Sequence, residues 1–99
     1  MIIEGNVEQN TLRIRAEGKI DMATAPELDK FLNENLRNVQ FVDIDFKDIS
    51  YISSAGLRVL LHLNKLLGGK KESIILRNIR DNVLSVLDLT GFTDMVTIY

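Results

Sequence analysis

A chain of 99 residues can bury one hydrophobic core but not two, so we expect a single domain spanning residues 1–99. Its 45% hydrophobic and 26% charged residues are typical of a folded globular protein, which argues against disorder. The formal net charge of −2 argues against binding to nucleic acid, and the lack of cysteine excludes disulfides and thiolate metal sites.

The first part of the chain predicts a β-hairpin followed by a helix. Apolar residues at short spacing in residues 2–7 and 12–16 indicate two strands, and in the second strand they alternate with polar residues. Thr24 and Glu27 have the spacing of a capping box, with Pro26 in the first turn, so a helix should begin there. The apolar residues of this helix follow the 3.6-residue period and should form one buried stripe: Leu28, Phe31, Leu32 and Leu36.

A third strand and a second helix follow. In residues 42–47 apolar residues alternate with Asp43 and Asp45, which indicates a strand with one buried and one polar face. The second helix is expected over residues 54–67, and a pair of glycines directly after it should end it. Its expected core stripe consists of Leu57, Leu60, Leu61 and Leu67.

The rest of the chain predicts a strand over residues 73–77, a third helix and a last strand over residues 95–99. Asn78 or Asp81 should cap the third helix, and Gly91 should end it. The order β-β-α-β-α-β-α-β predicts an α/β fold with a mixed, mostly parallel sheet and right-handed crossovers. We expect the helices to pack mainly on one face of the sheet, which leaves the other face partly exposed.

No membrane-spanning segment or secretory signal is evident. The longest apolar-rich stretch, residues 57–67, is interrupted by charged and polar side chains and is not suited to span a bilayer. The first residues lack a basic region followed by an apolar one. We therefore expect a cytoplasmic protein that does not act at a membrane.

The residues needed for catalysis are missing, so we expect no enzyme, cofactor or metal site. There is no G-x-S-x-G elbow, H-E-x-x-H pair or phosphate-binding P-loop. The only histidine, His62, lies two turns into the second helix and is interpreted as a solvated or partly covered residue. Asp43 and Asp45 share one strand face and are interpreted as its solvent face, because the strand pattern places no third carboxylate or histidine on that face beside them.

The unusual segment is the start of the second helix. Ser53 and Ser54 stand at its first turn, and Gly56 should keep that turn thin and open. One interpretation is that either serine caps the helix by accepting a free backbone N–H. The other is that a hydroxyl at this position can carry a phosphate, which the free amides and the helix dipole would stabilise. Residue spacing alone favours the cap.

Residues 51–58, Tyr-Ile-Ser-Ser-Ala-Gly-Leu-Arg, resemble the signature of the STAS-domain family, and specifically of bacterial anti-sigma factor antagonists. The likeness continues in residues 18–21, 23–28, 42–46 and 89–92, so it covers nearly the whole chain. This resemblance implies the STAS fold. It also implies a regulatory protein that binds other proteins.

By the same resemblance, Ser54 is the phosphoacceptor, with Ser53 as the less favoured candidate because many relatives carry Asp there. The unmodified domain would bind an anti-sigma factor that is also a serine/threonine kinase and so release a sigma factor. Phosphorylation by that kinase would end binding, and a metal-dependent serine phosphatase would restore it. The residues expected at the partner-binding site are Asp21, Thr24, Ser53, Ser54, Gly56, Arg58, His62 and Lys65.

One feature of this site comes from the residues themselves. Arg58, His62 and Lys65 recur at i, i+4 and i+7 and so form one basic stripe that leads away from Ser54; the alternative interpretation is a solvated helix face without a partner. By the resemblance, Asp21 stands at the end of the second strand, where the family motif has its Asp, and is expected near Ser54. The alternatives are a STAS scaffold or transport-associated domain without phosphorylation, a small hydrolase that uses Ser54, and a nucleotide-binding domain.

Overall fold

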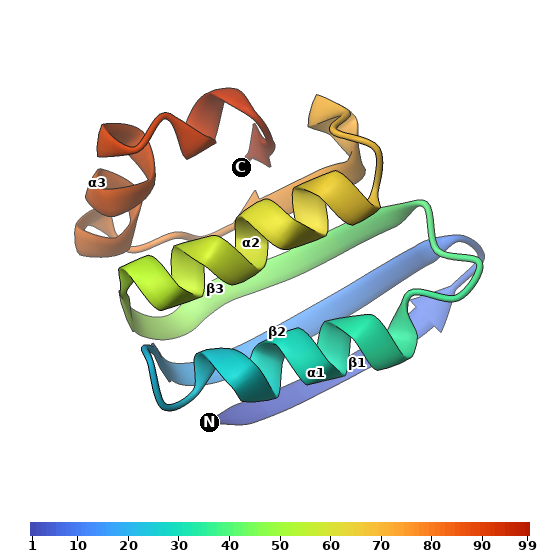
Figure 1. Cartoon of the computed structure of the whole chain (residues 1–99), viewed down its shortest axis with the longest axis horizontal. Helices are drawn as coiled ribbons and strands as arrows, with labels where there is room; N and C mark the ends of the chain where they lie inside the picture. Colours follow the sequence, from blue (N-terminus) through green and yellow to red (C-terminus); the bar gives the residue numbers. More distant parts are fainter.

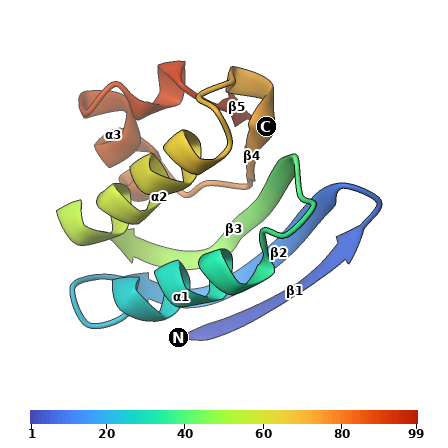
Figure 2. The ribbon, with the colours of Figure 1, turned by 45° about the vertical axis from the view of Figure 1, so that its right-hand side comes forward.

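The computed structural model describes residues 1–99, in which a five-stranded sheet carries three helices on one face (Figures 1 and 2). The strands are β1 (Ile2–Glu8), β2 (Thr11–Ile20), β3 (Phe41–Ile52), β4 (Ile74–Arg77) and β5 (Thr97–Ile98). The helices are α1 (Ala25–Asn35), α2 (Ser54–Leu66) and α3 (Asp81–Leu89), with short 3₁₀ turns at Lys71–Ser73 and Phe92–Asp94. The predicted order of elements is confirmed.

The strands lie side by side in the order of the chain, from β1 to β5. β1 and β2 pair antiparallel as a hairpin, and every later pair is parallel. Each parallel connection carries a helix or turn back across the same face, which agrees with crossovers of one hand. The mixed, mostly parallel sheet with helices on one face is the fold class that the sequence predicted.

Two strands are longer than expected. β2 continues to Ile20 and β3 to Ile52, several residues beyond the regular alternation of apolar side chains. The pairing of β2 with β3 shifts register between Arg15 and Glu17 and again after Gly18. Gly18 has a φ of 119°, a backbone conformation that glycine adopts without strain. At these irregularities the alternation of side chains between the two faces of the sheet is interrupted. The two-residue period of apolar side chains therefore ends there, although the strands remain paired.

The core consists of 22 buried apolar residues between the sheet and the helices. Of the residues expected in the buried stripe of the first helix, Leu28 and Leu32 are buried, whereas Phe31 and the C-cap residue Leu36 are only half-buried. The predicted stripe of α2 was partly wrong, because this helix packs against both the sheet and α1 and therefore buries a wider face. Its buried residues are Gly56, Leu57, Val59, Leu60, Leu63 and Asn64.

The predicted helix caps were wrong for α1 and α3. In a capping box, the amide of Thr24 would donate a hydrogen bond to the side chain of Glu27. It donates instead to Oδ1 of Asp21 at 3.0 Å. The N-cap of α3 is Arg80, whose side chain makes no capping bond, and Asn78 donates to Asp45 Oδ1 at 3.1 Å across the sheet. In both cases a neighbouring carboxylate offers a competing hydrogen-bond acceptor.

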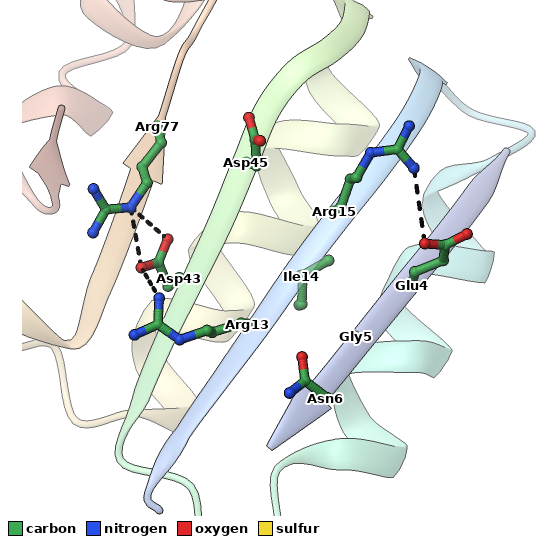
Figure 3. Close-up of a pocket in the computed structure, with 9 residues that line it drawn as sticks. All are labelled: Glu4, Gly5, Asn6, Arg13, Ile14, Arg15, Asp43, Asp45 and Arg77. Carbon is green, nitrogen blue, oxygen red and sulfur yellow. Dashed lines mark hydrogen bonds and ion pairs between the residues drawn. The ribbon is translucent and has the colours of Figure 1, made fainter. Parts of the chain in front are cut away.

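The uncovered face of the sheet is lined by charges (Figure 3). Glu4, Arg15, Asp45 and Arg77 lie opposite one another across β1 to β4, so the sign alternates from strand to strand. Asp43 was predicted on a solvent face but is only 6% exposed. Arg77 Nε donates to its carboxylate at 3.0 Å, and Arg13 approaches it at 3.4 Å from the other side, so the two arginines cover it.

Candidate functional site

The two serines lie in the turn from β3 to α2, beside the turn from β2 to α1. β2 and β3 are parallel neighbours, so both turns emerge at the same edge of the sheet. The amide of Ser53 donates to the carbonyl of Ile20 at 2.8 Å, which ties the two turns together. Asp21 follows Ile20 directly, and the expectation that it lies near the serines agrees with this contact.

Ser53 and Ser54 have different environments. Ser53 is the N-cap of α2: its backbone is extended, and its Oγ accepts from the amide of Gly56 at 3.4 Å. Its carbonyl accepts from the amide of Leu57 at 2.9 Å. Ser54 is the first residue of α2, is exposed, and its hydroxyl makes no hydrogen bond within the protein. The structure thus assigns the cap to Ser53 and leaves the hydroxyl of Ser54 free.

These environments predict different effects of alanine on stability. Ser53→Ala removes a long capping bond and should lower the free energy of unfolding by about 0.5–1 kcal/mol. Ser54→Ala removes a hydroxyl that makes no hydrogen bond and should change the free energy of unfolding by less than about 0.5 kcal/mol. Urea unfolding of both variants checks this difference, and equal losses would contradict the assignment of the cap.

Gly56 was expected to leave the first turn of α2 open, but it is buried. A Cβ built at this position would lie 2.6 Å from Ile20 Cγ2, 2.8 Å from Ile52 Cγ1 and 3.0 Å from the carbonyl oxygen of Ile20. Real Cβ atoms essentially never approach other atoms below 3.0 Å. The glycine therefore lets the start of α2 lie directly on the ends of β2 and β3. This close packing fixes the positions of Ser53 and Ser54.

The turn before α1 is held by the side chains of Asp21 and Thr24. Asp21 Oδ1 accepts from the amides of Ala23 at 2.9 Å and Thr24 at 3.0 Å. Thr24 Oγ1 accepts from the amide of Asp21 at 2.9 Å and donates to the carbonyl of Lys19. The pKa of Asp21 is lowered from its ordinary value, chiefly because the Thr24 amide donates to its carboxylate. Thr24 therefore shapes this turn, although it does not cap α1 as predicted.

The lowered pKa predicts how the contribution of Asp21 to stability depends on pH. A carboxyl group whose pKa is lower in the folded state stabilises the fold above its unfolded pKa, and this contribution disappears as the pH falls through the folded value. The stability difference between the protein and Asp21→Ala should be constant from pH 7 down to about pH 5 and shrink below about pH 4. Urea unfolding at pH 7 and pH 3 measures it, and an increase at pH 3 would contradict the account.

The exposed side of α2 carries the predicted basic stripe. Arg58, His62 and Lys65 are all exposed, and together we call them the α2 ridge. His62 is a partly covered helix residue as interpreted: its Nδ1 lies 3.3 Å from Oδ1 of Asp29 on α1. Arg58 and Lys65 form no ion pair within the protein.

A groove between α1 and α2 lies beside the ridge and adjoins the serine turn. It has a volume of about 400 Å³ and is lined by Met22, Ala25, Pro26, Asp29, Ala55, Arg58, Val59 and His62. Met22 is 81% exposed, which is unusual for a large apolar side chain. Met22 was not among the predicted site residues, although an apolar side chain in a polar turn between two motifs was a signal for it.

The structure contains no group of three histidine, aspartate or glutamate side chains that could hold a metal ion. None of its helices is long and apolar enough to cross a membrane.

Comparison with known proteins identifies the class of this domain. A family model described as the STAS domain matches residues 3–99, which is nearly the whole chain. The chain therefore belongs to the STAS-domain family.

The related proteins include anti-sigma factor antagonists. The chain is 29% identical over 90 residues to the anti-sigma-B factor antagonist of Bacillus subtilis (strain 168), covering 91% of this chain and 83% of that protein. It is 28% identical over 82 residues to the anti-sigma-B factor antagonist of Listeria monocytogenes, covering 82% of this chain and 72% of the relative. These relatives are named for antagonising another protein, which makes them regulators and not enzymes, as the sequence predicted.

Solved structures show the same fold. SpoIIAA, an anti-sigma factor antagonist solved in its unphosphorylated form, superimposes with a TM-score of 0.83 at 19% identity and covers 99% of this chain and 88% of its own. An anti-sigma factor antagonist from Mycobacterium paratuberculosis gives a TM-score of 0.85 at 22% identity and covers 99% of this chain and 84% of its own. At these identities the likeness establishes the arrangement of strands and helices.

Proposed function

We propose that this chain is an anti-sigma factor antagonist whose binding is switched by phosphorylation of Ser54. The observation that carries the proposal is the exposed hydroxyl of Ser54, which makes no hydrogen bond and stands at the first turn of α2. It adjoins the groove between α1 and α2 and the α2 ridge. The names of the relatives support the same role.

In the proposed cycle, the unmodified chain binds an anti-sigma factor that is also a serine/threonine kinase, and this binding frees a sigma factor. The kinase transfers phosphate to Ser54 and the complex dissociates. A metal-dependent serine phosphatase removes the phosphate and restores binding. All these partners act in the cytoplasm, and the chain itself serves as ligand and substrate.

The residues of the proposed binding site fall into two groups. Asp21, Thr24, Ser53 and Gly56 hold the two turns in place through the contacts described above. The residues that face a partner directly are Ser54, Arg58, His62 and Lys65, together with Met22 at the groove. A partner surface with an apolar side chain for the groove and carboxylates for the ridge would fit this arrangement.

Ser54 is a better phosphoacceptor than Ser53 on geometric grounds. A kinase must reach the hydroxyl from solvent and align it with the phosphate of ATP. Ser53 is half-buried, and its hydroxyl accepts a hydrogen bond from the amide of Gly56. Ser54 is exposed, and its hydroxyl makes no hydrogen bond within the protein. Modification of Ser53 would also remove the cap of α2.

The direct test is release of a sigma factor. The purified complex of the sigma factor and anti-sigma factor from the same genome is mixed with this chain, and the species are separated by size-exclusion chromatography. We expect free sigma factor and a new complex of the chain with the anti-sigma factor. The variant Arg58→Glu/Lys65→Glu should release less, because it reverses the charge of the ridge. An intact starting complex at large excess of the chain would contradict the proposal and favour an unregulated scaffold.

A further inference from the structure

The first strand of the sheet has no neighbour on its outer side. β1 is the outermost strand next to β2, and in Figure 3 it forms one border of the uncovered face. An edge strand of this kind presents the amides and carbonyls of every second residue to solvent. β1 has seven residues, whereas β5 at the opposite edge has two, so only β1 is long enough to accept another strand.

The side chains of β1 divide between the two faces of the sheet. Glu4 and Asn6 lie opposite Arg15 and Arg13 on the uncovered face, where Figure 3 shows them. Ile3, Gly5 and Val7 lie opposite buried residues of β2, on the side of the helices. Val7 is nevertheless 47% exposed, because nothing covers the outer edge of the strand.

We propose that two copies of this chain associate by antiparallel pairing of their β1 strands, with Gly5 at the twofold axis. In this register Glu4 lies opposite the partner's Asn6, and Ile3 lies opposite the partner's Val7. The first pair joins a carboxylate to an amide that can donate to it. The second pair covers apolar surface that is exposed in a single copy.

The acidic residues of β1 select this register. Antiparallel pairing matches residues of the same face, so the centre of symmetry lies on a residue of the strand. A centre on Glu4 places two glutamates opposite each other, and a centre on Asn6 places Glu4 opposite the partner's Glu8; both cost free energy. Centres nearer the ends pair only part of the strand. The register on Gly5 alone pairs all seven residues without a like-charged pair.

The surroundings of Gly5 agree with a central position. A Cβ at Gly5 would lie 2.9 Å from Phe31 Cζ, so the ring of Phe31 on α1 already fills the space over the strand on the helix side. The outer edge beside Gly5 is exposed. Two β1 strands that pair there would join the sheets of the two copies. Ser54 lies beyond β2 as seen from this edge, so it stays accessible in each copy.

Substitutions at Asn6 test the pairing with opposite expected effects. Asn6 is exposed; within its own chain it lies opposite the exposed Arg13 and donates to Glu8 at 3.2 Å, so a change there should leave the fold intact, which urea unfolding of each variant checks. In each dimer Asn6→Glu creates two pairs of like charge with Glu4, and Asn6→Lys creates two pairs of opposite charge. We expect the dimer dissociation constant to rise about tenfold for the first and fall about tenfold for the second. Asn33→Glu and Asn33→Lys on the exposed side of α1 are the matched controls and should change nothing.

Sedimentation equilibrium of the full chain from micromolar to millimolar concentration measures these constants. The register is tested separately by crosslinking, because the chain contains no cysteine of its own. An oxidised mixture of the single variants Glu4→Cys and Asn6→Cys should give mainly the mixed disulfide, since residues directly opposite are close enough for the bond. A protein that stays monomeric, equal effects at Asn6 and Asn33, or a dominant disulfide between two copies of the same variant would each overturn the proposal.

Discussion

Phosphorylation of Ser54 should weaken the complex with the anti-sigma factor kinase by about 100-fold or more, while the fold of the chain stays intact. A phosphate adds a charge of about −1.5 to −2 next to the first turn of α2. Within the chain, the positive end of the helix dipole stabilises this charge by up to about 2 kcal/mol. In the complex, the same dianion would lie beside the partner carboxylates that the ridge is expected to bind, where repulsion and desolvation cost several kcal/mol.

Calorimetric titration of the kinase, without ATP, with the unmodified and the phosphorylated chain measures the loss. Ser54→Asn is the control for size, because it enlarges the side chain without adding charge, and it should weaken binding by less than about tenfold. The phosphorylated form of Ser53→Ala should lose as much affinity as the phosphorylated parent. If phosphorylation lowered the free energy of unfolding by several kcal/mol, the switch would act through unfolding and not through the contact surface.

Replacement of Gly56 by alanine should lower the free energy of unfolding by about 3 kcal/mol. The added Cβ would lie 2.6 Å from Ile20 Cγ2 and 3.0 Å from the carbonyl oxygen of Ile20. The backbone at Ile20 is fixed by its pairing with Ile52 of β3 and by the hydrogen bond from the amide of Ser53, so it yields little, and α2 must move away from the sheet. This movement would also displace Ser54 and reduce its phosphorylation.

Gly68→Ala is the matched control for the loss of a glycine. Gly68 has a φ of 90°, and a Cβ there would meet nothing within 4 Å. Its replacement carries a backbone cost of about 1–2 kcal/mol and no clash, so it should destabilise less than Gly56→Ala. Urea unfolding compares the two. Equal losses would show that the close approach of α2 to Ile20 contributes little.

The order of the elements was predictable because each has a local signal. The apolar periods of α1 and α2 identify them as helices, and two glycines of positive φ, Gly68 and Gly69, follow α2 as expected. The placement of all helices on one face followed from the chain order and the handedness of crossovers. These signals depend on neighbouring residues, which a sequence shows directly.

Features that depend on contacts between distant segments were not predictable. The full length of β2 and β3 depends on register shifts between them, and the burial of Asp43 depends on Arg13 and Arg77 from two other strands. The sequence around Thr24 fits the pattern of a capping box, but the amide of Thr24 donates its hydrogen bond to the carboxylate of Asp21 and not to that of Glu27. In each case a competing partner determines the outcome.

The candidate site was predictable as a segment but not as a geometry. The sequence placed Ser53 and Ser54 at the start of a helix without deciding which of them caps it. That decision depends on backbone angles, which turn the hydroxyl of Ser53 toward the amide of Gly56. The groove beside Met22 is formed by two helices and has no signature in either one.

If Ser54 is the regulatory phosphoacceptor, peptide mapping after incubation with the kinase should find the phosphate on this residue. The chain, Ser53→Ala and Ser54→Ala are each incubated with ATP and the anti-sigma-type kinase of the same genome, and their intact masses are then measured. We expect one phosphate on the parent, mapped to Ser54, one on Ser53→Ala and none on Ser54→Ala. A phosphate that persists in Ser54→Ala, or a parent chain that no such kinase modifies, would contradict the claim.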